Sequence, residues 1–276
     1  MAETETEATV GQPFKDEMSE CFIRNYFESS ANEDELPLRA ENEVGEKQRW
    51  KHDDILALRD LMKQEKVLKP DFEDTFLVRC LRARSFDYEN AHELIKNYNK
   101  LHISSPHLFS PPHKLSDVFE DKVFTILPQR TDCDETILVI AAGRWSCLKY
   151  DFDTALSALV ATLELVSTDV FTQICGIVAI IDMSQFNWVQ LRSFGPLQAK
   201  KMAHIIEEAL PIRFKAIHIV NDSLLTYIAY SIIKPFLSQE LRSKIEFHKN
   251  NFQAVHRMIP PQSLPSEIGS GTTVND

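Results

Sequence analysis

The chain contains little glycine, and this scarcity restricts the chemistry it can support. Only 7 of its 276 residues are glycine, and none of them forms a Gly-x-Gly-x-x-Gly pattern or a P-loop. Nucleotide-binding loops need such glycines because their backbone must approach the phosphates closely. The chain also has no Gly-x-Ser-x-Gly elbow and no His-Glu-x-x-His zinc helix. We therefore predict a protein that is not an enzyme and needs no cofactor, and we keep an α/β hydrolase-like or nucleotide-using enzyme as a disfavoured alternative.

Paired cysteines are missing as well. The five cysteines are scattered, odd in number and without a Cys-x-x-Cys pair: Cys21, Cys80, Cys133, Cys147 and Cys175. This pattern is typical of reduced thiols in the cytosol, and it predicts neither a disulfide framework nor a metal site.

Clustered polar motifs are also scarce. His204, His218 and His248 stand far apart within predicted regular elements, so we expect them to be packed or surface residues and not ligands. Asp182 follows a buried strand without a partner base nearby in the sequence, and we predict a capping or turn aspartate.

No apolar run approaches the roughly 20 residues of a membrane span, and the N-terminus is acidic and polar, unlike a signal peptide. We expect a soluble, cytoplasmic protein. Basic stripes with interleaved aromatics are absent too, so nucleic acid is not a predicted partner.

The charge that is present lies mostly at one end. Residues 1–49 hold 13 acidic against 5 basic side chains, a net charge of −8 out of the total of −11. Residues 1–46 are therefore predicted to form an acidic, largely flexible arm, in which a short helix near Cys21–Phe27 could dock on the body. The remainder is nearly neutral and leaves room for a local basic patch.

Two kinds of periodicity follow the arm. Helical spacing in 50–66, 73–84 and 88–102 predicts a compact antiparallel bundle. Strands are then expected at 123–127, 137–142, 176–181, 214–220 and 246–248, and they alternate with helices at 153–174, 197–210 and 251–258. This alternation predicts an α/β fold with a mainly parallel sheet.

The stretch 221–237 (NDSLLTYIAYSIIKPFL) is apolar around nearly its whole circumference. We expect Asn221 or Asp222 to cap a helix there, and Pro235 to end it by moving Lys234 out of helical geometry. A helix that is apolar all round is buried on every side or faces lipid. Two interpretations stay open: a central core helix, or a lid with one face over an apolar cavity and the other toward a membrane.

Basic residues lie on both sides of this stretch in the sequence. They form three pairs: Lys200 with Lys201, Arg213 with Lys215, and Arg242 with Lys244. Basic residues near a surface attract anionic head groups at roughly 1 kcal/mol each, and their position around an apolar patch is typical of reversible membrane docking. Scattered surface lysines are the alternative.

Four segments occur in a characteristic order: FLVRCLRARSFDYENAHELIKNY (76–98), GIVAIIDMSQF (176–186), PIRFKAIHIVND (211–222) with KPFLSQELRSKIEFH (234–248), and LPSEIGSG (264–271). Together they resemble the CRAL-TRIO family, in particular its tocopherol-transfer and retinaldehyde-binding branch, over about residues 50–271. The resemblance implies a small all-helical module at 47–108 and, at 109–276, an α/β domain. In that domain a mainly parallel sheet flanked by helices encloses a lipid pocket under a lid helix.

The resemblance also implies site residues. Ten positions would line the pocket: Leu156, Leu159, Leu163, Ile177, Ile181, Met202, Ile205, Ile206, Leu210 and Ile217. Six would belong to the lid: Leu224, Leu225, Ile228, Ile232, Phe236 and Leu237. Four would bind a phosphoinositide head group: Arg84, Arg213, Lys215 and Lys244.

This chain departs from the branch at several of its positions. Glu240 stands where a further basic residue is found, Leu159 and Leu163 stand where the tocopherol-transfer branch has serines, and Ser270 separates the closing glycines. The two leucines imply a drier pocket.

The resemblance implies a monomeric carrier of a single tocopherol, retinoid or similar isoprenoid, which transfers it at phosphoinositide-containing membranes by reversible association. The lid would hinge near Asn221 and at Lys234–Pro235, with Tyr230, Ile233, Phe236 and Leu237 toward the membrane. The alternative is a protein that transfers or senses phospholipids or phosphoinositides, which would need polar groups inside the pocket.

Overall fold

The predicted strands form a single sheet in the computed structural model, which describes residues 33–63, 72–249, 251 and 256. Its five strands lie side by side in chain order, β1 to β5, and only the β1–β2 pair is antiparallel. The strands are β1 (Phe124–Arg130), β2 (Thr136–Ala141), β3 (Ile177–Asp182), β4 (Phe214–Val220) and β5 (Ile245–Phe247). The apolar, β-branched runs of β2 and β3 suit central strands that are covered on both faces, and β4 departs from this pattern at Lys215 and His218.

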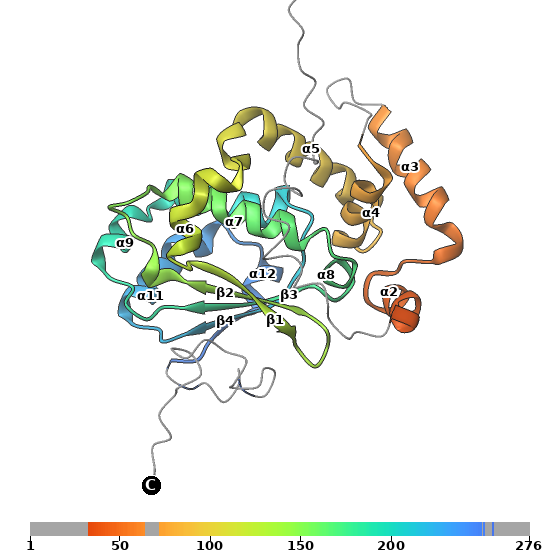
Figure 1. Ribbon diagram of the computed structural model, residues 1–276. Helices are drawn as coiled ribbons and strands as arrows, with labels where there is room; N and C mark the ends of the chain where they lie inside the picture. The colour runs from red at the N-terminus through yellow and green to blue at the C-terminus, as the bar shows by residue number, and fades with distance from the viewer. Residues whose placement is uncertain (1–32, 64–71, 250, 252–255, 257–276) are drawn as a thin grey trace, which may run out of the picture.

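Helices cover the sheet and extend beyond it. Figure 1 shows α7 across one face of the sheet, with α3, α4 and α5 beyond it, and α9 and α11 at the opposite end of the molecule. The helices are α2 (Leu36–Val44), α3 (Lys51–Lys63), α4 (Asp74–Ala83), α5 (Tyr88–Ser104), α6 (Ser116–Glu120), α7 (Phe152–Val166), α8 (Val170–Cys175), α9 (Trp188–Ser193), α10 (Pro196–His204), α11 (Leu224–Ile233) and α12 (Gln239–Ser243). The structure therefore has the α/β architecture that the alternating pattern predicts.

Helices α3, α4 and α5 pack against one another as the three predicted helical patterns require. Their apolar stripes meet in a common core, in which Leu58, Leu77, Leu81 and Ile95 are all fully buried. Asp87 caps α5 by accepting a hydrogen bond from the backbone N–H of Asn90. None of the described helices combines the length and the hydropathy that a membrane span requires.

The end of the acidic arm is folded, which differs from the expectation of a largely flexible arm up to residue 46. Helix α2 buries Ala40 and Val44 against Ile174 and Cys175 of α8. Gly45 ends the helix with φ of 77°, a conformation that glycine adopts without a steric penalty. The short helix expected near Cys21–Phe27 lies outside the described residues.

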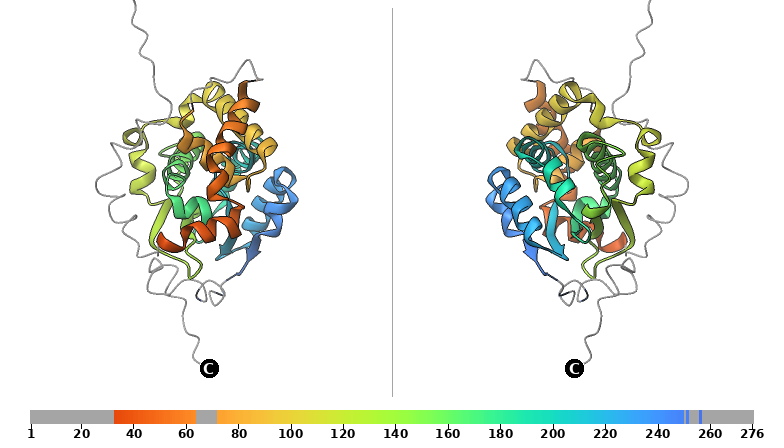
Figure 2. Two further views of the ribbon diagram at one scale, coloured as in Figure 1. Left: turned by 90° about the vertical axis from the view of Figure 1, so that its right-hand side faces the viewer. Right: turned by 90° about the vertical axis from the view of Figure 1, so that its left-hand side faces the viewer.

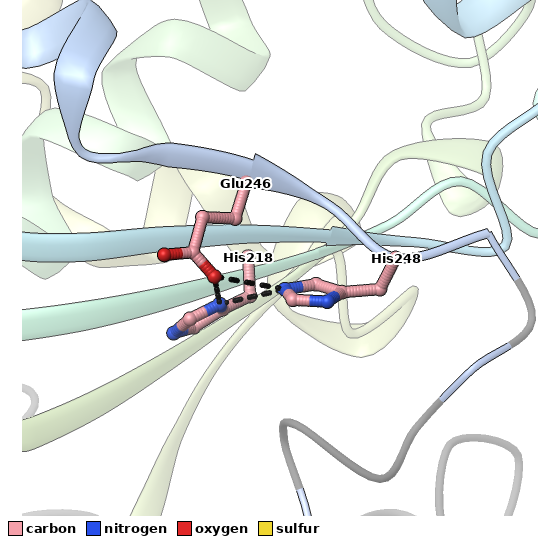
Figure 3. A group of neighbouring side chains, drawn as sticks. All are labelled: His218, Glu246 and His248. Carbon is pink, nitrogen blue, oxygen red and sulfur yellow. Dashed lines mark hydrogen bonds and ion pairs between the residues drawn. The ribbon is translucent and has the colours of Figure 1, made fainter.

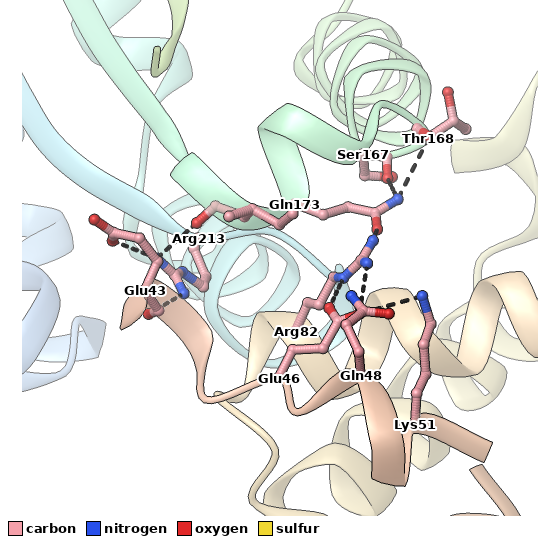
Figure 4. A network of polar contacts seen from close by, with 10 residues as sticks. Glu43, Glu46, Gln48, Lys51, Arg82, Ser167, Thr168, Gln173 and Arg213 are labelled. Carbon is pink, nitrogen blue, oxygen red and sulfur yellow. Dashed lines mark hydrogen bonds and ion pairs between the residues drawn. The ribbon is translucent and has the colours of Figure 1, made fainter. Parts of the chain in front are cut away.

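A buried ion pair fixes the arm to the helical module (Figure 4). The fully buried carboxylate of Glu46 accepts two hydrogen bonds from Arg82, at 2.6 and 3.0 Å, and lies 3.2 Å from the ammonium of Lys51. Arg82 also donates to the side chain of Gln173 in α8 at 2.5 Å. The arm is thereby joined to both the helical module and the sheet domain.

The predicted helix 153–174 is wrong as a single element. It divides at Ser167–Asp169 into α7 and α8, because the Asp169 carboxylate caps α8 by accepting the backbone N–H of Thr172 at 2.7 Å. Arg130 of β1 donates to the same carboxylate at 2.7 Å, so the turn between α7 and α8 is held against the sheet. The helix expected near Asn251–Met258 and the closing LPSEIGSG segment fall outside the described part of the chain.

Candidate functional site

An apolar cavity of about 250 Å³ lies between the sheet and the helices α7, α10 and α11. Strands β2, β3 and β4 supply one wall through Ile140, Ile181 and Ile217, and α7 supplies another through Leu156 and Leu159. Such a lining favours a hydrophobic ligand over a polar one, because a buried polar group without a hydrogen bond is costly.

Few polar side chains interrupt the lining. They are Thr226 and Tyr230 of α11 and Trp145, which follows β2. The indole nitrogen of Trp145 is buried and has no hydrogen-bond partner among the described residues. It is a hydrogen-bond donor left without an acceptor among these residues.

Six of the ten residues that the resemblance assigned to a pocket line this cavity: Leu156, Leu159, Ile181, Met202, Ile206 and Ile217. The other four are fully buried in the core outside it: Leu163, Ile177, Ile205 and Leu210. Leu163 is two helical turns, about 10 Å, beyond Leu156. Ile205 begins the π-helical turn η7 (Ile205–Ala209), which packs against α5 and also brings the next residue, Ile206, to the cavity wall.

Aromatic residues of the wall were missed in the sequence. Phe124, Phe152, Phe186 and Phe194 all line the cavity. Phe124 lies in the predicted strand 123–127, Phe152 begins α7, and Phe186 and Phe194 lie in loops, where no apolar period marks them. A concentration of phenylalanine between predicted elements was the only available signal.

Helix α11 covers the cavity with one face. Thr226, Ala229, Tyr230 and Ile233 line the cavity at the i, i+3, i+4, i+7 spacing of one helix face, and Leu237 continues the lining beyond the helix. Thr226 is the one fully buried residue of α11. The interpretation as a central core helix is therefore wrong.

The two sides of α11 differ from the expected ones. Tyr230, Ile233 and Leu237 were expected to face a membrane, yet they line the cavity, and Phe236 alone of that set is exposed, at 37%. Tyr230 and Ile233 face the cavity because they lie four and seven residues after Thr226, and residues at this spacing share one face of a helix. Of the six residues assigned to the lid, only Leu237 lines the cavity; Leu224, Leu225, Ile228, Ile232 and Phe236 do not.

Exposed apolar side chains lie on α11, on the turn that follows it and on the helices that pack against it. Leu224 is 74% exposed, and α11 packs against α9 and α10, which expose apolar side chains of their own. We call this set of side chains the apolar rim: Trp188, Val189, Leu197, Leu224, Tyr227 and Phe236. Figure 1 shows α9 and α11 together at the same end of the molecule.

Both ends of α11 are built differently from the sequence prediction. Ser223 caps the helix in a capping box with Thr226, and neither Asn221 nor Asp222 does so. At the other end, Lys234 keeps helical geometry because the chain continues into a 3₁₀ turn at Lys234–Phe236, whose first positions accept a proline. Pro235 therefore tightens the helix end without displacing Lys234.

Asn221 lies in the left-handed region, with φ of 52°, just before α11. Its side-chain amide donates to the carboxylate of Asp182 at 2.7 Å, and that carboxylate also accepts the backbone N–H and the hydroxyl of Ser184. Asp182 is thus the turn residue that the sequence predicted. It ties the end of β3 to the entry of α11.

The four basic residues of the predicted head-group site approach one another through two carboxylates. We call Arg84, Arg213, Lys215 and Lys244 the basic cluster. Glu43 of α2 lies 2.5 Å from the ammonium of Lys215 and 3.9 Å from the guanidinium of Arg213. Figure 4 shows Glu43 beside Arg213. The Lys215 side chain packs closely against Gly176. A Cβ atom at position 176 would lie only 2.9 Å from it, so the absence of a side chain there leaves room for Lys215.

Glu240 is the second carboxylate of the basic cluster. It lies 2.6 Å from the ammonium of Lys244, and Arg84 and Arg213 also lie within its electrostatic influence. Hydrogen bonds from lysine hold the pKa of both Glu43 and Glu240 below the usual range, so both stay ionised. They neutralise half of the formal charge of the cluster.

The remaining basic pairs lie elsewhere or are engaged otherwise. Lys201 pairs with Asp153 at 2.8 Å in an open cleft of about 480 Å³, which borders the cavity at Trp145 and Phe152. Arg242 donates to the backbone of Ser238 at 3.2 Å. The expectation that all three pairs form one patch is therefore wrong for Lys201.

A single residue connects the basic cluster to the exit of α11. Arg84 donates to the backbone carbonyl of Glu207 at 2.5 Å, and the Glu207 carboxylate accepts the backbone N–H of Ser238 at 3.1 Å. Glu207 lies in the π-helical turn η7, a geometry found frequently at functional sites. Glu207 therefore links Arg84, where an anion would bind, to Ser238 in the segment that follows α11.

Known proteins share this organisation. The family model described as the CRAL/TRIO domain matches residues 120–271. The chain is 35% identical over 239 residues to the alpha-tocopherol transfer protein-like protein of Mus musculus, covering 86% of this chain and 70% of that one. It is 30% identical over 240 residues to clavesin-1 of Rattus norvegicus, covering 84% and 67%.

A solved structure shares the fold. The crystal structure of Sfh5 superimposes with a TM-score of 0.53 at 11% identity, over 88% of this chain and 85% of that one. At this identity the likeness concerns the fold alone.

Proposed function

Because the chain belongs to the CRAL/TRIO family of lipid-binding proteins, we propose that it is a monomeric, non-enzymatic carrier of one hydrophobic lipid. The lipid occupies the cavity under α11, and the carrier exchanges it at phosphoinositide-containing membranes, with which it associates reversibly. A tocopherol, a retinoid or a similar isoprenoid is the class of ligand, in line with the name of the tocopherol transfer protein-like relatives. The apolar lining of the cavity is the observation that carries the proposal.

The lining also favours a lipid with one small polar group over a phospholipid. A phospholipid inside the cavity would bury a charged head group, and a buried charge needs a partner. The polar side chains of the wall are those of Thr226, Tyr230 and Trp145, and none of them is charged. A lipid with a single hydroxyl or carbonyl group fits this lining better, with the Trp145 N–H as its donor.

Helix α11 acts as the lid in this account. Its inner face, at Ala229 and Ile233, covers the lipid, while the apolar rim on its outer side enters the membrane interface. The lid opens about Asn221 and the 3₁₀ turn at Lys234–Phe236. Opening toward the bilayer keeps both the lipid and the inner face of the lid out of water.

The basic cluster binds the phosphoinositide head group. Its phosphates displace Glu43 from Lys215 and Glu240 from Lys244, because phosphate offers more charge and more acceptor oxygens than a carboxylate. The head group at Arg84 also competes with the carbonyl of Glu207, whose carboxylate holds Ser238 at the exit of the lid. Head-group binding thereby loosens the lid.

Transfer of a fluorescent isoprenoid between donor and acceptor liposomes tests the proposal. Leu156→Trp fills the cavity from α7, and Leu148→Trp makes the same change at a position that is 95% exposed. The proposal expects the transfer rate to fall at least fivefold for Leu156→Trp and to stay unchanged for Leu148→Trp. Equal rates for the two variants would contradict it.

Overpacking costs about 1–3 kcal/mol of folding stability, so a second cavity variant accompanies the first. Ala229→Leu fills the same space from the half-buried inner face of α11. Thermal melts followed by circular dichroism identify the variant that stays folded at the assay temperature. The transfer rate of that variant decides the question.

A further inference from the structure

Three polar side chains gather on the face of the sheet opposite the cavity (Figure 3). Ile217 and Ile219 of β4 line the cavity, so His218 between them points to the other face. His218 pairs in register with Glu246 of β5, and His248 follows two residues later on the same face. The three side chains come from two neighbouring strands and converge on one point.

The donor atoms form a narrow triangle. Nδ1 of His218 and Nε2 of His248 lie 2.8 Å apart, and each lies 3.7 Å from Oε2 of Glu246. A tetrahedral Zn²⁺ with bonds of about 2.0 Å holds its ligand atoms about 3.3 Å apart. The three separations, 2.8, 3.7 and 3.7 Å, lie on both sides of that spacing, so small side-chain rotations bring all three atoms within bonding distance of one ion.

Hydrogen bonding alone accounts for only part of this geometry. One imidazole can donate to the other across 2.8 Å, but 3.7 Å is too long for a hydrogen bond to the carboxylate. The Glu246 side chain is 61% exposed, yet it is directed toward the two histidines and not away into solvent. A cation between the three groups would engage all of them at once.

We propose that His218, Glu246 and His248 bind one divalent transition-metal ion, with Zn²⁺ as the ion that best fits two imidazoles and one carboxylate. Three protein ligands leave a fourth position of the tetrahedron for water, and the exposure of Glu246 gives water access to it. Alkaline-earth ions fit less well, because they prefer oxygen ligands.

The position in the fold gives the ion a mechanical role. The strands β4 and β5 are neighbours in the sheet, and the segment 221–244 that contains α11 leaves from the end of β4 and returns at the start of β5. Figure 2 shows this segment, in blue, along one side of the molecule. An ion that joins His218 to Glu246 and His248 therefore crosslinks β4 to the chain at β5, the two strands between which the segment with α11 is connected.

The three proposed metal ligands could not be recognised from their spacing in the sequence. His218 and His248 are 30 residues apart and belong to no zinc-binding pattern, so each was expected to be a packed or surface residue. The parallel pairing of β4 with β5 brings them together. The expectation that they are isolated is wrong.

Metal content after equilibrium dialysis against buffered Zn²⁺ tests the proposal on the full-length chain. The wild type is expected to retain one Zn²⁺ per chain, and Glu246→Gln and His248→Gln are each expected to weaken binding at least tenfold. His204→Ala is the matched control, because it removes an exposed histidine that contacts a glutamate, Glu208, at 2.8 Å. Its affinity should equal that of the wild type.

Two outcomes would overturn the proposal: a wild type that retains no Zn²⁺, or a Glu246→Gln and His248→Gln pair that binds as tightly as the wild type. Glu246 and His248 are preferred to the more deeply buried His218, so that misfolding does not mimic lost binding. Substitution of Co²⁺ for Zn²⁺ separates this site from the exposed thiol of Cys133, since an imidazole and carboxylate site has no sulfur-to-cobalt charge-transfer band. Such a band, unchanged in Glu246→Gln, would also refute it.

Discussion

The carboxylate of Glu43 lies 2.5 Å from the ammonium of Lys215, 172 residues further along the chain. This contact places an acidic residue of the N-terminal arm on the basic cluster. Glu43 therefore occupies the place that we propose for a phosphate. In the proposed mechanism the arm competes with the membrane for the same lysine.

Removal of this competitor should strengthen membrane binding. Glu43→Gln frees Lys215, and one basic residue near an anionic surface contributes roughly 1 kcal/mol. We expect about fivefold tighter binding to liposomes with phosphatidylinositol bisphosphate, measured by co-sedimentation. Glu41→Gln, an exposed position on the same helix, is the control for net charge alone. If both variants bind equally tightly, the contact with Lys215 has no specific effect.

Reversal of the basic cluster should do the opposite. Arg213→Glu with Lys215→Glu places two more acids beside Glu43 and should weaken binding to the same liposomes at least tenfold. Lys100→Glu with Lys114→Glu makes the same charge change at exposed positions outside both the cluster and the apolar rim. Unchanged binding of the first pair would refute the head-group site while leaving the cavity in place.

The apolar rim can be tested separately from charge. Leu224→Gln removes an exposed apolar side chain from the outer face of α11, and loss of its burial in the interface should weaken liposome binding about threefold to tenfold. Ile103→Gln makes an equivalent change at the end of α5, where the side chain is 69% exposed. Equal affinities of both variants would show that α11 does not enter the bilayer.

Trp145 should distinguish lipids by their polar group. Trp145→Phe removes the buried N–H but keeps an aromatic ring in the wall, so the affinity for a lipid with one hydroxyl should fall about threefold to tenfold. The affinity for the corresponding hydrocarbon should not change. Trp50→Phe, at a 45% exposed position, controls for the substitution itself, and a competition assay in detergent measures both affinities. An equal loss for both lipids would contradict a hydrogen bond.

A histidine in the helical module should make the protein sensitive to acid. Burial against the ring of Phe109 lowers the pKa of His102 to about 4, below the usual value of 6.5. Between these two pH values the unfolded chain binds a proton that the folded chain does not, so the free energy of unfolding should fall as the pH drops from 6.5 to 4. His102→Phe should flatten this part of the curve in urea titrations, whereas His52→Phe, at an exposed position, should not.

The sequence predicted the elements whose buried residues follow a regular pattern along the chain. A continuous apolar run marked β3, an apolar run interrupted only by Lys215 and His218 marked β4, and helical spacing marked α3, α4 and α5. The break between α7 and α8 was missed because Asp169 acts as a cap only together with Arg130, which lies 39 residues away in the sequence. An N-cap within an apolar period has no local signature strong enough to divide the helix.

The cavity was predictable in kind but only partly in its residues. The faces of α7 and α10 were recognised through Leu156 and Met202, whereas Leu163 lies further along α7 and Leu210 follows the turn η7 after α10, both outside the cavity. Periodicity identifies the face of an element but not how far along it a cavity extends. The contact of Glu43 with Lys215 and the convergence of His218 with His248 depend on tertiary packing and have no signal in the sequence.

The central claim is that the cavity beneath α11 holds a single lipid. Exposure of the purified protein to mixed-lipid liposomes, separation by gel filtration, and quantification of the extracted lipid by mass spectrometry test it most directly. The account predicts about one isoprenoid or similar hydrophobic molecule per chain, lost in Leu156→Trp and kept in Leu148→Trp. Recovery of no stoichiometric lipid, or equal recovery from both variants, would contradict it.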